Sequence, residues 1–183
     1  MTDAKIINMK LLMTMQPTAK ALAIIYKHLT KVSSGTRVED YCKSVLGYTE
    51  NQLEIELSKP VNDTLSGPSW NPFHQDLNIL YKLLQRVCGL AELGDEKWTT
   101  PSDAIEYHLQ QVKDIRDEMF HKKLENIDVK YFQEFISSLQ NSLTKALQQT
   151  ELMSGVPTSK EVNDLIADLD CILAELYLQL QHL

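Results

Sequence analysis

The sequence predicts an all-α protein, a helical bundle, and three observations support this. Glycine and proline number only six each among 183 residues, so helix-breaking residues are sparse. Apolar residues recur every three or four positions in one segment after another, whereas the alternation typical of strands is nearly absent. Residues that begin and end helices gather between these segments. The chain, 43% hydrophobic and 23% charged, has enough apolar sequence for a core without disulfides or metal.

The N-terminal part predicts one longer helix followed by two short ones. Pro17 can begin the first helix, and the Ser-Ser-Gly sequence at 33–35 ends it. The short helices are expected around 38–46 and 52–57. Thr49 and the glutamine three residues later have the spacing of a capping box, which favours a helix start at this point.

The middle of the chain predicts a loop and then two helices. Proline and glycine are frequent in 58–71, which favours a loop. Asn71 as N-cap and Pro72 in the first helical position open the next helix, and the segment 89–99 breaks it. A further helix is expected from Thr100 and Pro101 to about His121.

Two long helices complete the prediction. Asp128 can cap the first of them, and the Ser-Gly-Val-Pro sequence at 154–157 ends it. Thr158 and Glu161 form a capping box for the second. The apolar residues of this last helix recur at heptad-like intervals: Ile166, Leu169, Leu173, Leu176, Leu180 and Leu183. They predict either the seam of a homodimer or packing within the chain.

These elements suggest a bundle with one addition at its C-terminal end. Residues 1–150 are expected to form the bundle, with the N-terminal helices in 1–57, the loop in 58–71 and further helices in 72–150. Residues 151–183 are expected to form a C-terminal helix that packs on the bundle or on a dimer partner.

Charge and cysteine content exclude several classes of function. The net charge of −7 provides no general basic field, so any contact with nucleic acid has to be local. The three cysteines form no Cys-x-x-Cys pair, which predicts no metal site and favours a reducing compartment. No apolar run is long enough for a membrane span, and the first residues lack the pattern of a signal peptide. We therefore expect a cytoplasmic protein without membrane contact, metal or cofactor.

An arginine in the helix that ends at His121 is the main candidate for function. With Ile105 as zero and about 100° per residue, Arg116 falls at about 20°, inside the apolar stripe, and His121 at about 160°. The two side chains therefore converge only if the helix unwinds after Phe120 or if they meet across a dimer axis. A buried guanidinium needs a negative partner, which is either an internal carboxylate such as Asp76 or Glu106, or a phosphate of a ligand.

Several segments resemble a HEPN domain (higher eukaryotes and prokaryotes nucleotide-binding). They are FHQDLNILYKLLQRVCGL, the following Trp and Pro, and VKDIRDEMFH. The first helix of one HEPN subtype is similar to the segment MKLLMTMQPTAKALAIIYKHL. That subtype is the animal one typified by a DAZ-interacting RING-type ubiquitin ligase. The residues that carry the resemblance are Asp76, Leu77, Leu80, Leu83, Leu84, Cys88, Gly89, Leu90, Trp98, Pro101, Arg116, Asp117 and His121.

The resemblance implies an α-helical bundle that forms homodimers. It also implies a cleft lined by Arg116 and His121 of both copies that cleaves RNA without metal. Asp117 stands where asparagine is more usual in this subtype and is the third candidate catalytic residue. The adjacent Lys122 and Lys123 are candidates for binding neighbouring phosphates. The alternative is a catalytically silent helical module that dimerises or recruits protein partners within a larger signalling or ubiquitin-pathway protein.

Overall fold

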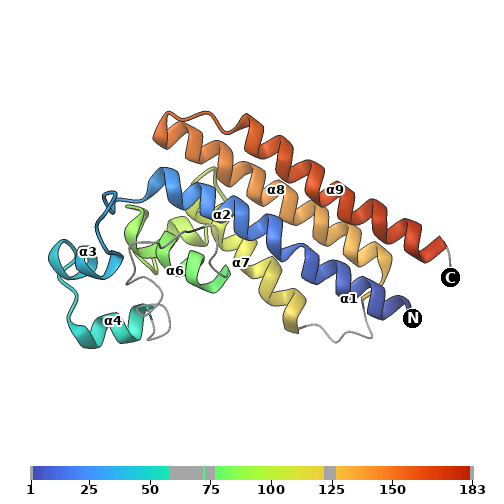
Figure 1. Cartoon of the computed structure of the whole chain (residues 1–183), viewed down its shortest axis with the longest axis horizontal. Helices are drawn as coiled ribbons and strands as arrows, with labels where there is room; N and C mark the ends of the chain where they lie inside the picture. The colour runs from blue at the N-terminus through green and yellow to red at the C-terminus, as the bar shows by residue number, and fades with distance from the viewer. Residues whose placement is uncertain (1, 58–71, 73–76, 122–126, 182–183) are drawn as a thin grey trace.

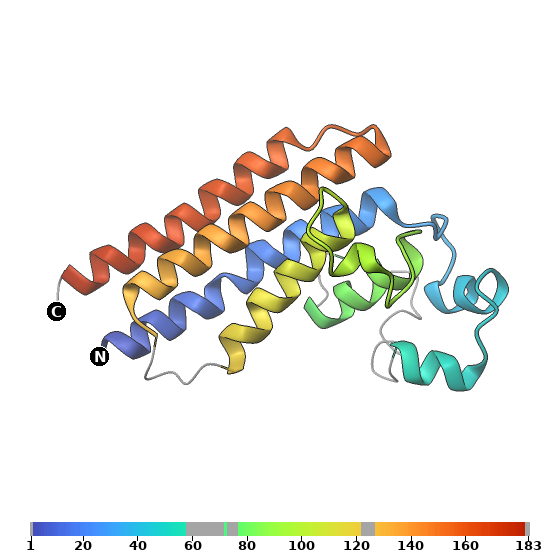
Figure 2. The same ribbon diagram turned by 180° about the vertical axis from the view of Figure 1, so that it is seen from behind.

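The computed structural model describes residues 2–57, 72, 77–121 and 127–181, and within these ranges all regular structure is helical (Figure 1). The predicted all-α bundle is therefore confirmed for the described part of the chain. Two long helices, α8 (Val129–Ser154) and α9 (Ser159–Gln181), form an antiparallel hairpin, and α1 (Asp3–Met13) and α2 (Met15–Leu29) run alongside it. Seen from behind, α1 begins at the end of the bundle where α9 stops (Figure 2).

The first two helices form an almost continuous rod. Thr14 separates them, and its hydroxyl donates to the Leu11 carbonyl at 2.6 Å. The expectation that a helix begins at Pro17 is wrong by two residues, because α2 begins at Met15. A proline is tolerated there, since the first N–H groups of a helix have no partner inside the helix.

α1 is joined to α9 by an ion pair between a buried lysine and a half-exposed glutamate. The Lys10 ammonium lies 2.7 Å from Glu175 Oε2; the lysine side chain is 4% exposed and the glutamate 46%. The ammonium donates to this carboxylate and so keeps a partner after burial. The hydrogen bond from Lys10 holds the pKa of Glu175 below its usual value.

The apolar seam of α9 packs inside the chain. Leu169 and Leu176 are fully buried in the single hydrophobic core, and Leu173 and Leu180 pack half-buried against it. The heptad-like spacing predicted either a dimer seam or packing within the chain. These four residues pack within the chain. Ile166 is half-buried, and Leu183 lies outside the described residues.

The helix caps that the sequence predicts for the α8–α9 hairpin form only in part. Asp128 caps α8 by accepting from the Tyr131 N–H at 2.8 Å. At the other end Ser154 is followed by the cap residue Gly155, whose φ of 72° is left-handed. The expected capping box at Thr158 is not formed. Its N–H donates to Glu151 Oε1 at 3.3 Å, and its buried hydroxyl donates to the Leu147 carbonyl at 3.1 Å. The expected boundary at residue 150 falls inside the last turn of α8.

A second layer carries the candidate site. The helix α6 (Leu77–Val87) packs on α2, and α7 (Ile105–His121) packs on α8. Between them, the short 3₁₀ helix η2 (Glu96–Trp98) packs on α7. Residues 100–104 are bends and irregular backbone rather than the expected first helical turn, so α7 begins at Ile105. Pro72 is described, but the expected cap at Asn71 lies outside the described residues.

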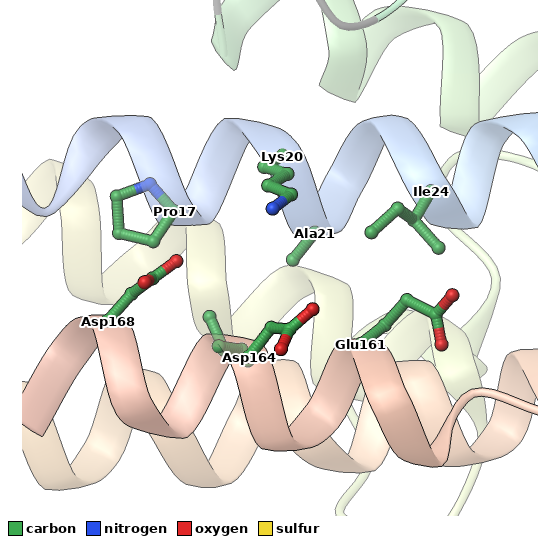
Figure 3. A pocket seen from close by; sticks show the side chains of 8 residues that line it. Pro17, Lys20, Ala21, Ile24, Glu161, Asp164 and Asp168 are labelled. Carbon is green, nitrogen blue, oxygen red and sulfur yellow. The ribbon is translucent and has the colours of Figure 1, made fainter.

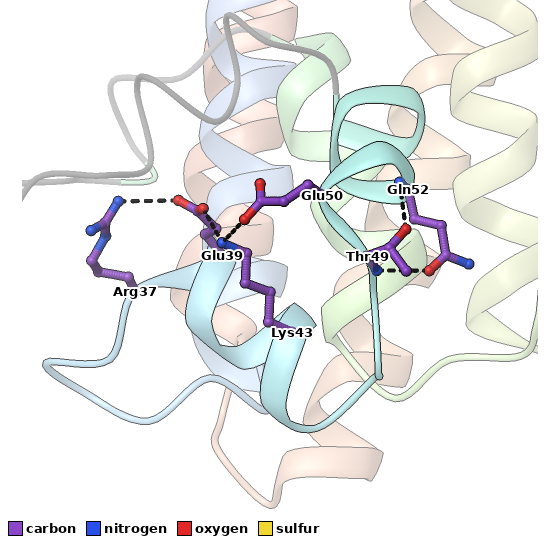
Figure 4. A network of polar contacts seen from close by, with 6 residues as sticks. All are labelled: Arg37, Glu39, Lys43, Thr49, Glu50 and Gln52. Carbon is purple, nitrogen blue, oxygen red and sulfur yellow. Dashed lines mark hydrogen bonds and ion pairs between the residues drawn. The ribbon is translucent and has the colours of Figure 1, made fainter.

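The small helices α3 (Val38–Ser44) and α4 (Glu50–Leu57) project from one end of the bundle. The predicted capping box is confirmed here: the Thr49 N–H donates to Gln52 Oε1 at 2.8 Å, and the Gln52 N–H to Thr49 Oγ1 at 3.2 Å (Figure 4). Lys43 joins the two helices by pairing with Glu39 and Glu50, and these carboxylates raise the pKa of Lys43.

Candidate functional site at the edge between α6 and α7

Arg116 lies in the apolar stripe of α7, as the periodicity predicted. The neighbouring stripe residues Ile105, Leu109, Val112 and Met119 are between 0% and 7% exposed. The Arg116 side chain is 19% exposed, so its guanidinium sits at the rim of the core and retains some contact with water.

The described contacts of Arg116 are a neutral amide and a carboxylate. Its Nη1 donates to Asn78 Oδ1 on α6 at 2.7 Å and lies 3.7 Å from Asp117 Oδ1. Glu106, one of the two internal carboxylates considered as a partner, instead accepts from the Ala91 N–H at 3.0 Å and so holds the loop before η2. The other, Asp76, lies outside the described residues.

Tyr81 brings a buried hydroxyl close to this arginine. It follows Asn78 by one helical turn on α6 and is 5% exposed; its hydroxyl oxygen has no hydrogen-bond partner among the described residues. Burial raises the pKa of Tyr81, and the positive charge of Arg116 opposes this shift. The phenol therefore stays protonated. A buried O–H without a partner costs about 1–3 kcal/mol, and the described residues provide none for Tyr81. Sequence reasoning missed Tyr81, because a tyrosine in an apolar stripe is typical of a core residue.

His121 is the last residue of α7 and is exposed. Because α7 is helical from Arg116 to His121, the two side chains point about 140° apart around the helix axis. The unwinding after Phe120 that would bring them together in one chain is not seen. Lys122 and Lys123, the candidate phosphate-binding residues, lie outside the described residues.

Three carboxylates lie on α7 close to Arg116 in sequence: Asp114, Asp117 and Glu118. Asp117 has a 45% exposed side chain, and Asp114 is exposed and accepts from Gln110 Nε2 at 2.8 Å. Glu118 is exposed and accepts from the Tyr131 hydroxyl of α8 at 3.1 Å. The exposed face of α7 beside Arg116 is therefore acidic.

Two hollows lie away from Arg116. One, of about 20 Å³, lies between α2 and α9, where Lys20 projects over the groove and Glu161, Asp164 and Asp168 project from the opposite helix (Figure 3). The other, of about 170 Å³, lies between α7 and α8. Its lining residues are Ile115, Glu118, Tyr131, Glu134, Phe135 and Ser138.

No metal centre or membrane span is found within the described ranges. No group of three or more His, Cys, Asp or Glu residues there could hold a metal ion. No helix there is both long and apolar enough to cross a bilayer. Cys42, Cys88 and Cys171 are free thiols.

Comparisons with models of protein families, with curated proteins and with solved structures found no match to this chain. The resemblance to HEPN domains therefore rests on the motif residues themselves, among which Asp117 stands where asparagine is more usual.

Proposed function

We propose that this chain is a cytoplasmic RNA-directed domain of the HEPN type, in which Arg116 binds a backbone phosphate. The supporting observation is the position of the guanidinium at the rim of the core, oriented by the neutral Asn78 at 2.7 Å. The Asn78 amide orients the guanidinium without adding a negative charge of its own, and a planar fork of donors suits phosphate oxygens.

Cleavage of RNA would require two copies of the chain. Arg116 and His121 point about 140° apart on one helix, so a single copy cannot place both on one phosphate. In a homodimer, the ribose 2′-oxygen would attack phosphorus while the bond to the 5′-oxygen breaks. His121 of one copy would take the proton from the 2′-OH or give one to the leaving 5′-oxygen, and Arg116 of the other would offset the negative charge on the non-bridging phosphate oxygens. The 2′-OH is the nucleophile in this scheme, so no metal is needed.

The test of this scheme is a cleavage assay on single-stranded RNA in the presence of a chelator. Wild type should leave 2′,3′-cyclic phosphate ends and should not cut DNA. Arg116→Ala and His121→Ala should each reduce the rate, the latter by about 10²–10⁴-fold because proton transfer is lost. Co-expression of the two variants should restore roughly a quarter of the activity. Half of the dimers would be mixed, and one of their two equivalent sites would be intact.

A return of RNA cleavage on co-expression of the two variants is explained only by a site that is shared between two copies of the chain. If the mixture stays as inactive as either variant while the wild type cleaves RNA, the shared site is wrong. Cleavage that survives in the Arg116→Ala, His121→Ala double variant would come from another nuclease.

A second candidate function, a catalytically silent protein-interaction module, is favoured by the charge distribution. The chain carries a net charge of −7; Asp117 lies 3.7 Å from Arg116, and Asp114 and Glu118 are exposed on the same helix. These carboxylates repel phosphate and attract basic protein surfaces. A wild type that neither binds nor cuts RNA would favour this function.

A further inference from the structure

The hollow between α7 and α8 combines two kinds of surface. Ile115 and Phe135 are half-buried and pack against the hydrophobic core, so they form an apolar floor. Glu118 and Glu134 are exposed and stand on different helices at the rim. This hollow differs from an ordinary acidic helix face in its volume of about 170 Å³, which leaves room for part of a side chain.

The aromatic rings of the hollow are held in place. Phe135 packs against the buried Phe132, with ring centroids 6.2 Å apart and planes tilted by 39°. The Tyr131 hydroxyl donates to Glu118 Oε1 at 3.1 Å, which links α8 to α7 across the hollow. Burial and the neighbouring Glu118 raise the pKa of Tyr131, so this hydroxyl stays a donor at neutral pH.

The second carboxylate is available for a ligand. Glu134 makes no hydrogen bond and no ion pair with any residue that the structure describes. The six lining residues include no lysine, arginine or histidine. The groove between α2 and α9 differs in this respect, because Lys20 of the chain itself faces the three carboxylates there (Figure 3).

We propose that the hollow between α7 and α8 binds an arginine side chain of a partner polypeptide. Two carboxylates from different helices suit the planar guanidinium, with its five donors, better than the compact ammonium of lysine. The rings of Tyr131 and Phe135 offer faces on which a guanidinium stacks, and Ile115 contacts the aliphatic stem. The acidic chain attracts a basic polypeptide by its net charge as well.

The inference is independent of RNA binding at Arg116, and a nuclear magnetic resonance titration separates the two. The probe is the pentapeptide Gly-Ser-Arg-Ser-Gly with blocked ends, compared with the same peptide carrying citrulline, which keeps the shape and lacks the charge. The arginine peptide should cause saturable shifts of amide signals in 115–118 and 131–138. The citrulline peptide should not.

Two variants locate the binding. Glu134→Gln should weaken the arginine peptide about two- to fivefold, the range for one partly exposed ion pair. Its matched control is Glu161→Gln, which changes the net charge equally but stands opposite Lys20 and should leave the affinity unchanged. Ser138→Phe places a ring in the hollow at an exposed position, leaves the charge unaltered and should abolish binding.

Several results would overturn the proposal. These are no saturable shifts, equal binding of the citrulline peptide, an equal effect of Glu134→Gln and Glu161→Gln, or full binding by Ser138→Phe. A short oligouridylate that shifts the same signals and displaces the peptide would also overturn it, because the hollow would then bind RNA. Loss of RNA binding at Arg116, by contrast, has no bearing on this titration.

Discussion

Arg116 illustrates how the contacts of one residue decide the cost of removing it. The described guanidinium contacts are with Asn78 and with the half-exposed Asp117. We expect Arg116→Ala to lower the free energy of unfolding by about 1.5 kcal/mol, the low end for a hydrogen bond to a partly exposed charged group. Urea denaturation measures this, with Arg37→Ala, an arginine 45% exposed, as the control. A loss of about 3–5 kcal/mol would instead indicate that a buried carboxylate had been orphaned.

Tyr81 gives a prediction of opposite sign. Its hydroxyl is buried without a hydrogen-bond partner among the described residues, so Tyr81→Phe removes an unsatisfied group. This variant should be as stable as the wild type or more stable by about 1 kcal/mol. Tyr131→Phe is the matched control, because it removes a hydroxyl that donates to Glu118 and should destabilise the chain. A clear loss of stability in Tyr81→Phe would show that its hydroxyl has a partner in solution.

Single residues could be predicted from the sequence only where the rule is local. The position of Arg116 in the stripe follows from helical periodicity alone. Its contact with Asn78 and the proximity of Tyr81 depend on how α6 is rotated against α7, which no spacing within either helix specifies. Glu106, which was considered as a partner of Arg116, accepts a hydrogen bond from the backbone N–H of Ala91, fifteen residues away in sequence.

The helix pair α7 and α8 contains a buried titratable group. His108 is 4% exposed, and burial, assisted by the positive charge of Lys145, holds its pKa below the usual value of 6.5. The unfolded chain therefore takes up the proton first. The stabilisation is fully present above pH 6.5 and is lost as the pH falls below it.

We expect His108→Gln to flatten the decline in melting temperature between pH 7 and pH 5. Lys145→Met should flatten it partly, because it removes the charge that disfavours the imidazolium. Differential scanning calorimetry across this range measures both. An unchanged slope in His108→Gln would mean that another group is responsible for the loss of stability in acid.

The ends of the helices, like the contacts of single residues, depend partly on neighbours in the chain and partly on contacts with other helices. The capping box at Thr49 and the cap at Asp128 form as the sequence predicts, since each needs only neighbours in the chain. The box at Thr158 fails because Glu151, across the turn of the hairpin, accepts from the Thr158 N–H. The helices expected to start at Pro17 and at Thr100 start a few residues away from these positions. The sequence carries no signal that distinguishes the first turn of a helix from a non-helical turn.

For the whole molecule, periodicity was sufficient to predict an all-α bundle but insufficient to predict its oligomeric state. The seam of α9 is used inside the chain, where Leu169 and Leu176 are fully buried. The expectation of a homodimer therefore rests on the resemblance to HEPN domains alone. We still predict a dimer, measured by light scattering at tens of micromolar. A monomer at that concentration would remove the shared Arg116–His121 site, though not RNA binding by Arg116.

The most direct test of the central claim is the affinity of single-stranded RNA measured by fluorescence anisotropy at several salt concentrations, with chelator present. Wild type should bind with an affinity that falls as salt rises, and Arg116→Gln should weaken binding and reduce the salt slope by about one phosphate contact. Arg37→Gln, which removes the same charge from the distant α3 region, should change neither. Equal behaviour of all three proteins, or no binding by the wild type, would contradict the proposal that Arg116 serves an RNA-directed site.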